Sequence, residues 1–257
     1  MVDSLVSAVT AIGLETVGNL VWLIFGACLA GLVRGFSGFG TAMVYLPFAA
    51  SVMPPVWAVT SLVVMDFIAP LMIAHRTARD SDLGDVVRLG VGCLAGLPLG
   101  VTILMIFSAD AFRYAVSALS ILLLVLLWSG LRFRGNLTRP MVYGTGALSG
   151  VLGGAVGIPG PPVIFLYLAS SLPASAIRAN NFLFLLLADA LLLTVLFIQG
   201  MLFWAPLLIG ICMTVPYLAF ILIGAAMFNP AKEKSYRHVA YAIIAASALK
   251  GLPDFAA

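Results

Sequence analysis

The residues of this sequence that could do chemistry stand around two interruptions in long apolar segments. The first interruption is GFSGFG, Gly35 to Gly40, with Arg34 directly before it and Thr41 directly after it. The second is GIPGPP, Gly157 to Pro162. A charge inside a bilayer costs at least about 2.5 kcal/mol, so an arginine within an apolar segment indicates a function by default. The alternative is that Arg34 caps carbonyl groups at a helix end or reaches to the membrane interface.

Backbone amide groups at these interruptions favour an anion as the ligand. Glycine lets the chain turn and approach a ligand closely, and proline removes a donor and stops a helix. A half-helix that begins after each interruption, near Thr41 to Val44 and near Pro161 to Val163, would present N–H groups and a positive dipole end. Hydroxyl and amide side chains suit an oxyanion, whose oxygens only accept hydrogen bonds. The candidate substrate-binding residues are Arg34, Ser37, Gly38, Phe39, Gly40, Thr41, Ser61, Gly157, Ile158, Pro159, Gly160, Pro161, Arg178, Asn180 and Asn181.

Several of these candidates also have a plainer interpretation. Arg178 could be an ordinary basic residue at a cytoplasmic helix start. Small polar residues such as Thr60 and Ser61 commonly make interhelical hydrogen bonds in membranes. Asp66 and Asp189 lie in the middle of apolar segments, where desolvation favours the protonated form. Each of them could carry a coupling proton or donate a structural hydrogen bond.

Other chemistries have little support in the sequence. Metal-binding HxxxH and HExxH patterns, paired carboxylates and a GxxxxGK[ST] phosphate loop are absent, so we expect no metal ion, no cofactor and no ATP coupling. GFSG fits the GxSG pattern of intramembrane serine proteases, with Ser37 as the nucleophile. Such an enzyme needs a histidine base, and His75 and His238 both stand at predicted cytoplasmic helix ends. We therefore expect a non-enzymatic protein, with the protease and an anion channel as alternatives.

The elements that position these residues are membrane helices. The chain is 63% hydrophobic and 9% charged, with a mean hydropathy of +1.16. Soluble domains carry about 25% charged residues, so the fold class is an all-α polytopic membrane protein. The net charge of +3 is small and scattered, and no nucleic-acid partner is expected. The cysteines at 28, 93 and 212 stand in apolar stretches as packing residues.

Apolar runs of about 20 residues predict spanning helices. They lie at 54–75, 88–107, 111–131, 175–199, 201–228 and 237–252, and two interrupted hairpins lie at 18–51 and 141–172. Gly31, Gly35 and Gly38 align with Gly150, Gly154 and Gly157, each pair 119 positions apart. We interpret the chain as two repeats, 1–135 and 136–257, each a broken, re-entrant-like hairpin followed by three transmembrane helices.

Basic residues in the loops predict the orientation of the two repeats. Three clusters belong in the cytoplasm by the positive-inside rule: Arg76, Arg79 and Arg88; Arg132, Arg134 and Arg139; Lys232, Lys234 and Arg237. If each hairpin returns to its starting side, both termini lie outside, and Arg113 and Lys250 are the basic residues left there. A parallel repeat would place the third cluster outside, so we expect inverted repeats. Two inverted breaks can meet near the bilayer midplane, where secondary transporters bind substrates.

These motifs resemble the TauE/SafE family of sulfite and organosulfonate exporters. The resemblance rests on the first hairpin with YLP (Tyr45 to Pro47) and AVTSL (Ala58 to Leu62), and on GxxGIPGPPVIFLYL with RANNFLFLL in the second half. It covers nearly the whole chain. Thr41 and Ala42 depart from the family pattern, since many members continue with glycines there, and this departure alters the expected pocket.

The resemblance implies a multi-pass protein of the bacterial inner membrane that moves an anion without ATP. Sulfite, sulfoacetate and related organosulfonates are the leading substrates. We expect export by alternating access. The expected partners are this small inorganic or organosulfur anion and the lipid bilayer, and a homo-oligomer is compatible with the sequence.

Overall fold

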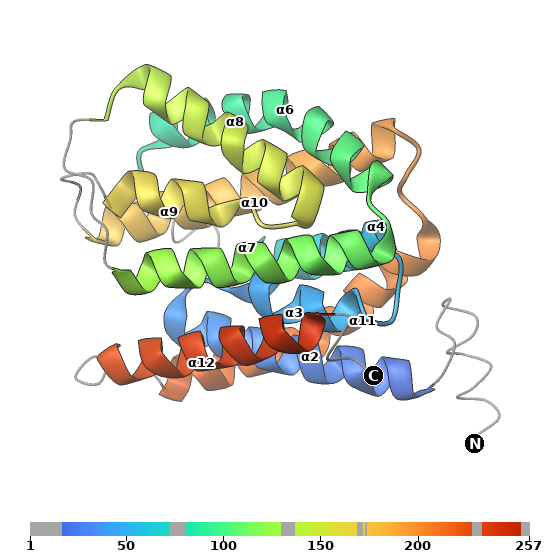
Figure 1. Ribbon diagram of the computed structural model, residues 1–257. Coiled ribbons are helices and arrows are strands. Elements are labelled where there is room, and N and C mark those ends of the chain that lie inside the picture. The colour runs from blue at the N-terminus through green and yellow to red at the C-terminus, as the bar shows by residue number, and fades with distance from the viewer. Residues whose placement is uncertain are drawn as a thin grey trace. The chain divides into compact units, whose positions relative to one another are not determined.

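The computed structural model describes residues 17–71, 81–129, 137–168, 172, 174–227 and 233–252. This part of the chain is helical throughout and contains no strand (Figure 1). Its helices are α2 (Val17–Ser37), α3 (Thr41–Ala49), α4 (Pro55–Leu71), α6 (Leu83–Ile106), α7 (Ala109–Ser129), α8 (Arg139–Val156), α9 (Gly160–Leu168), α10 (Ala174–Ile198), α11 (Trp204–Met227) and α12 (Glu233–Gly251).

Five of the described helices are long and apolar enough to cross a membrane. They are Gly18–Ser37, Leu83–Ile106, Ala109–Ser129, Ala176–Ile198 and Trp204–Met227. The prediction of an all-helical, multi-pass membrane protein is therefore confirmed.

Helix ends differ from the predicted ranges where polar residues extend a helix beyond its apolar part. α6 begins at Leu83 rather than at 88 because Asp82 caps it, and α12 begins at Glu233 rather than at 237. Hydropathy finds only the apolar part of a helix, and so it missed these polar first turns. The loop residues His75, Arg76, Arg79, Arg132, Arg134 and Lys232, and both chain termini, lie outside the described residues.

Both predicted interruptions break the helix, and each break is shorter than the interrupting motif. α2 continues into GFSGFG, so the first break comprises residues 38–40. α9 begins at Gly160, and the two prolines that follow lie in its first turn, where a missing N–H is tolerated. The aligned residues Gly38 and Gly157 have φ angles of 78° and 69°. Residues with a side chain rarely adopt this left-handed backbone conformation, which explains why glycine occupies both positions.

After the first break, α3 turns back along α2. Trp22 Nε1, near the start of α2, donates a hydrogen bond to Ser51 Oγ, which follows α3, over 3.2 Å. The rings of Trp22 and Phe48 also pack together, with centroids 5.0 Å apart. A nine-residue helix is only about 14 Å long, so α3 cannot cross a bilayer alone. α8 and α9 form a similar hairpin, in which α9 runs back beneath α8 (Figure 1).

The chain divides into two compact units, and each combines segments of both predicted repeats. Unit 1 comprises Met1–Met65, Phe107–Leu124 and Leu202–Ala257, and unit 2 comprises Asp66–Ile106 and Val125–Met201. The hairpin α2–α3 therefore shares a unit with α11 and α12, and the hairpin α8–α9 shares one with α6 and α10. The repeat boundaries and the inverted orientation of the repeats stay predictions.

Rows of glycines let helices pack backbone to backbone within each unit. A Cβ atom added at any of these glycines would lie under 3.0 Å from a backbone atom of the partner helix. They are Gly92, Gly96 and Gly100 of α6 with Gly146, Gly150 and Gly154 of α8, and Gly31 and Gly35 of α2 with Gly224 of α11. Such close approach is a main source of helix association in membranes. The aligned pairs Gly31 with Gly150 and Gly35 with Gly154 thus make the same kind of contact.

Candidate anion-binding site

The first break brings a guanidinium group and two hydroxyl groups together in unit 1. Arg34 Nη1 donates a hydrogen bond to Thr41 Oγ1 over 3.3 Å. Thr41 Oγ1 also shares a 2.9 Å hydrogen bond with the hydroxyl of Tyr217. Thr41 and Tyr217 are buried, whereas Arg34 is half-buried. These bonds connect the end of α2 to the start of α3 and connect both to α11.

The N-terminus of α3 is not capped by a side chain. Its N-cap residue is Gly40, whose φ is 94° and which makes no side-chain hydrogen bond. The first N–H groups of a helix find no carbonyl partner within the helix, and here they belong to Thr41, Ala42 and Met43. The guanidinium of Arg34 lies beside this positive dipole end. The first break therefore suits a ligand that carries negative charge and only accepts hydrogen bonds.

The hydroxyl of Ser37 bonds to the turn itself. It lies 2.6 Å from the carbonyl oxygen of Val33 and 2.8 Å from that of Phe39, and it accepts a 3.3 Å bond from the amide of Phe39. These bonds hold the break in shape. His238 is exposed in α12, and His75 lies outside the described residues, so no described histidine serves Ser37 as a base. A contact from Ser37 to a substrate stays a prediction.

Residues 38–40 form the accessible part of the first break. Gly38 is exposed, and Phe39 and Gly40 are half-buried. A Cβ atom added to Gly38 would meet nothing within 4 Å, so the space beside this backbone is open. This openness separates the first break from the second.

The second break, in unit 2, is more deeply buried and has fewer free amide groups. Gly157, Ile158, Gly160 and Pro161 are buried, and Pro159 is half-buried. The amides of Gly157 and Ile158 donate to carbonyls at the end of α8, over 2.9 Å to Gly153 and 3.4 Å to Leu152. The prolines have no N–H. Donors for an anion are thus concentrated at the first break, and a convergence of the two breaks stays a prediction.

Asn180 of α10 holds the start of α6 and also lies beside Tyr167 of α9. Gly160 faces Leu185 of α10, with 3.3 Å between an added Cβ and Leu185 Cδ2, whereas Asn180 comes five residues earlier. Asn180 Oδ1 accepts a 2.7 Å hydrogen bond from the amide of Asp82, the residue that caps α6. This bond links α10 to the start of α6.

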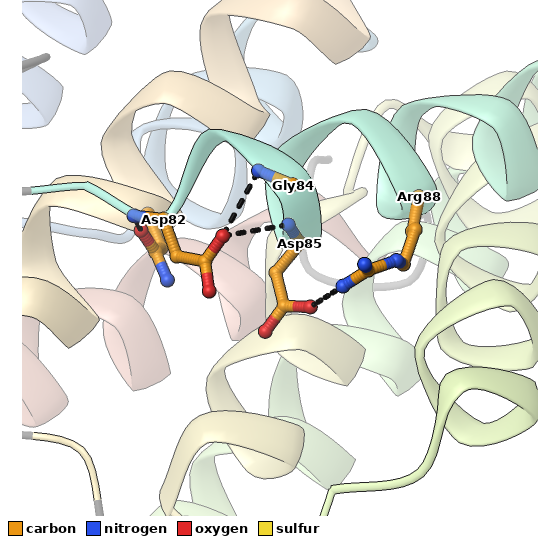
Figure 2. Close-up of polar contacts among 5 residues, drawn as sticks. Asp82, Gly84, Asp85 and Arg88 are labelled. Atoms are coloured by element: carbon orange, nitrogen blue, oxygen red, sulfur yellow. Dashed lines mark hydrogen bonds and ion pairs between the residues drawn. The ribbon is translucent and has the colours of Figure 1, made fainter.

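The start of α6 is acidic (Figure 2). Asp82 Oδ1 accepts bonds from the amides of Gly84, over 2.9 Å, and Asp85, over 3.2 Å. Asp85 forms an ion pair with Arg88 at 2.6 Å. A carboxylate beside Asn180 disfavours an anion there, although Arg88 offsets part of the charge.

The remaining candidates are dispersed. The Arg178 side chain is exposed, and Asn181 is half-buried. Ser61 is buried and bonds to the carbonyl of Ala58, over 3.0 Å, and to the hydroxyl of Tyr45, over 3.2 Å. These contacts match the plainer interpretation of Ser61, and its role toward a substrate stays a prediction.

The two coupling candidates, Asp66 and Asp189, are both buried, with 9% and 7% of their surface exposed. Each has an interaction partner. In unit 2, Asp189 of α10 lies close enough to Cys93 of α6 to interact electrostatically. A role in proton coupling stays a prediction for both carboxyl groups.

Comparison with known families identifies the chain. The model of the sulfite exporter TauE/SafE family matches residues 23–251, which include most of the first hairpin, the whole second hairpin and the complete network at the first break. The chain belongs to the TauE/SafE family of sulfite exporters. No curated protein and no solved structure matches it significantly. Because TauE/SafE proteins are membrane transporters, this membership supports a transporter rather than an enzyme.

Tyr217 is the residue of this TauE/SafE site that sequence analysis missed. It stands in the middle of an apolar helix, directly after Pro216, and is fully buried. A tyrosine hydroxyl inside a membrane helix needs a partner, and this requirement was the available signal. The partner itself, Thr41, could not be read from the sequence because 176 residues separate the two.

We expect Tyr217→Phe to raise the KM for the transported anion by about 2- to 12-fold. This is the effect of losing one net hydrogen bond of about 0.5–1.5 kcal/mol, because Thr41 is then held less firmly. Uptake kinetics in liposomes measure the change. Tyr143→Phe is the matched control, since Tyr143 is exposed on α8. Equal KM values for the two variants would show that the Tyr217 hydroxyl has no part in binding.

Proposed function

We propose that this TauE/SafE protein exports a small oxyanion, such as sulfite, sulfoacetate or a related organosulfonate, across the bacterial inner membrane. The first break binds the anion and is exposed to the two sides of the membrane in turn. The observation that carries this proposal is the Arg34–Thr41 pair beside the uncapped start of α3. The sulfite exporter family supports the direction and the substrate class.

The chemistry of the break fits a sulfite or sulfonate head group. Three oxygens share its negative charge, and all of them accept hydrogen bonds. Arg34 can supply a charged fork, and α3 can supply consecutive amide groups. Thr41 adds a hydroxyl beside the guanidinium, so it narrows the space there. We propose that Thr41 tunes which member of this substrate class is accepted.

The membrane potential favours export without a coupling ion. One negative charge leaving a negative interior gains about 2.3 kcal/mol per 100 mV, and a dianion gains about twice as much. A proton-coupled mechanism would use Asp66 and Asp189, the two carboxyl groups buried in apolar helices. In the proposed topology both chain termini lie outside the cytoplasm.

Counterflow in liposomes tests the proposed function. Purified protein is reconstituted with unlabelled sulfite inside, and entry of labelled sulfite is followed with sulfoacetate, thiosulfate or sulfate as competitors. A transporter gives saturable entry that overshoots equilibrium and that sulfonates inhibit. Entry without overshoot would favour an anion channel. If none of the four anions moves or competes, the proposed substrate class is wrong.

A further inference from the structure

We propose that unit 1 contains a second anion-binding position, formed by Arg113, Ser117 and Ser120 of α7 beside the C-terminal end of α12. The proposal deepens the proposed export function and rests on it. In the predicted topology the start of α7 faces the outer side, so this position would bind the anion on its way out. We call Arg113, Ser117 and Ser120 the α7 donor face.

Two nitrogen atoms of the Arg113 guanidinium interact with neighbouring residues, and the third is buried. Its Nε donates a 3.1 Å hydrogen bond to the carbonyl of Gly251, at the end of α12. Its Nη1 lies 3.9 Å from the carboxylate of Asp110, which is 70% exposed. Its Nη2 is buried and has no hydrogen-bond partner among the residues that the structure describes. The guanidinium charge of Arg113 therefore lies mostly inside the protein, and one of its N–H donors has no described acceptor.

The hydroxyl groups of Ser117 and Ser120 lie on the same face of α7. Spacings of four and three residues place them in line with Arg113. Both serines are 0% exposed, and within the described part of the chain neither hydroxyl has a hydrogen-bond partner. Ser117 Oγ lies 2.9 Å from the position that a Cβ atom of residue 251 would occupy. Arg113 and Ser117 thus both lie against Gly251.

Ser149 of α8 is also buried without a hydrogen-bond partner among the described residues, but four helical threonines of this chain are bonded. Serine and threonine in a membrane helix normally donate to the carbonyl four residues earlier. Thr60, Thr102, Thr194 and Thr214 all do so, over 2.7–2.9 Å. The hydroxyl groups of Ser117 and Ser120 do not make this bond. A buried donor without a partner is costly, so the α7 donor face is arranged for a partner from outside the helix.

The chemistry of the α7 donor face selects an anion. A guanidinium amino group and two hydroxyls along one helix face are all hydrogen-bond donors, and the guanidinium adds positive charge. The carboxylate near it, that of Asp110, points to solvent with most of its surface exposed. Arg113 Nη2 and Ser117 Oγ belong to the two side chains that lie against Gly251, and an oxyanion with several acceptor oxygens can accept from both. Because the serines are fully buried, we propose the transported anion, rather than a lipid head group, as the ligand.

The double variant Ser117→Ala/Ser120→Ala separates binding from a merely structural role. Two buried hydroxyls without partners are removed, so the melting temperature without anion should stay the same or rise. If the face binds the anion, the rise in melting temperature caused by sulfite or sulfoacetate should shrink, and the KM for export should increase about tenfold. Ser129→Ala is the control, because Ser129 is exposed on the same helix and bonds to its own backbone.

Arg113→Lys is a second variant that keeps the charge and loses the planar fork. Arg113→Lys should also raise the KM. It provides an independent test if the double variant fails to fold. An unchanged KM and an unchanged sulfite-induced shift in both variants would overturn the second position. So would a shift produced by phosphatidylglycerol alone, since the ligand would then be a lipid. Loss of transport in Arg34→Gln with normal transport in both α7 variants would leave the proposed function intact and remove only this inference.

Discussion

Replacing Arg34 by glutamine should lower the kcat/KM of sulfite export by about 10- to 150-fold. Glutamine keeps a hydrogen-bond donor on a shorter side chain and removes the positive charge beside the start of α3. A hydrogen bond to a charged group contributes about 1.5–3 kcal/mol, which corresponds to this range. Liposome transport at several sulfite concentrations gives kcat and KM separately.

The design of this experiment distinguishes charge from geometry. Arg34→Lys keeps the charge and loses the fork, so its kcat/KM should lie between those of the wild type and Arg34→Gln. Arg139→Gln is the matched control, because Arg139 is exposed at the start of α8. Melting temperatures establish that each variant is folded. Normal transport by folded Arg34→Gln would remove the first break as the binding position.

Replacing Gly150 by alanine should lower the free energy of unfolding by about 1–3 kcal/mol, the usual cost of forcing extra volume into a packed interior. The added Cβ would lie under 3.0 Å from the backbone carbonyl of Cys93 on α6. Backbone atoms cannot change rotamer as a side chain can, so the added Cβ forces the axes of α6 and α8 apart.

Gly144 provides the control on the same helix. A Cβ atom added there meets nothing within 4 Å. Alanine favours a helix over glycine by about 1 kcal/mol, so Gly144→Ala should leave the melting temperature unchanged or raise it. Thermal unfolding in detergent measures both variants. If both substitutions change stability in the same direction, helix propensity and not backbone contact governs this interface.

The chemistry of the two breaks could be read from the sequence because glycine and proline act locally. Gly38 and Gly157 were aligned from spacing alone, and both have the left-handed φ that only glycine adopts easily. Arg34 and Thr41 can also be predicted from the sequence, because a charge in an apolar segment and a hydroxyl stand directly beside the first break. Asn180 shows the limit of this reasoning. Its amide type indicates an anion contact, whereas its Oδ1 accepts a hydrogen bond from the amide of Asp82, 98 residues earlier.

By itself, the sequence determined that this chain is a multi-pass helical membrane protein, which helices are interrupted, and which charged residue is placed at a break. These properties depend on the free energy of each segment in lipid and on the conformations that each residue type allows. Only the tertiary structure decided that α11 supplies Tyr217 to the first break, that α6 packs on α8, and that α7 faces Gly251. Such pairings depend on the fit between surfaces far apart in the chain, and many apolar helices with small residues would fit one another almost equally well until all of them are packed.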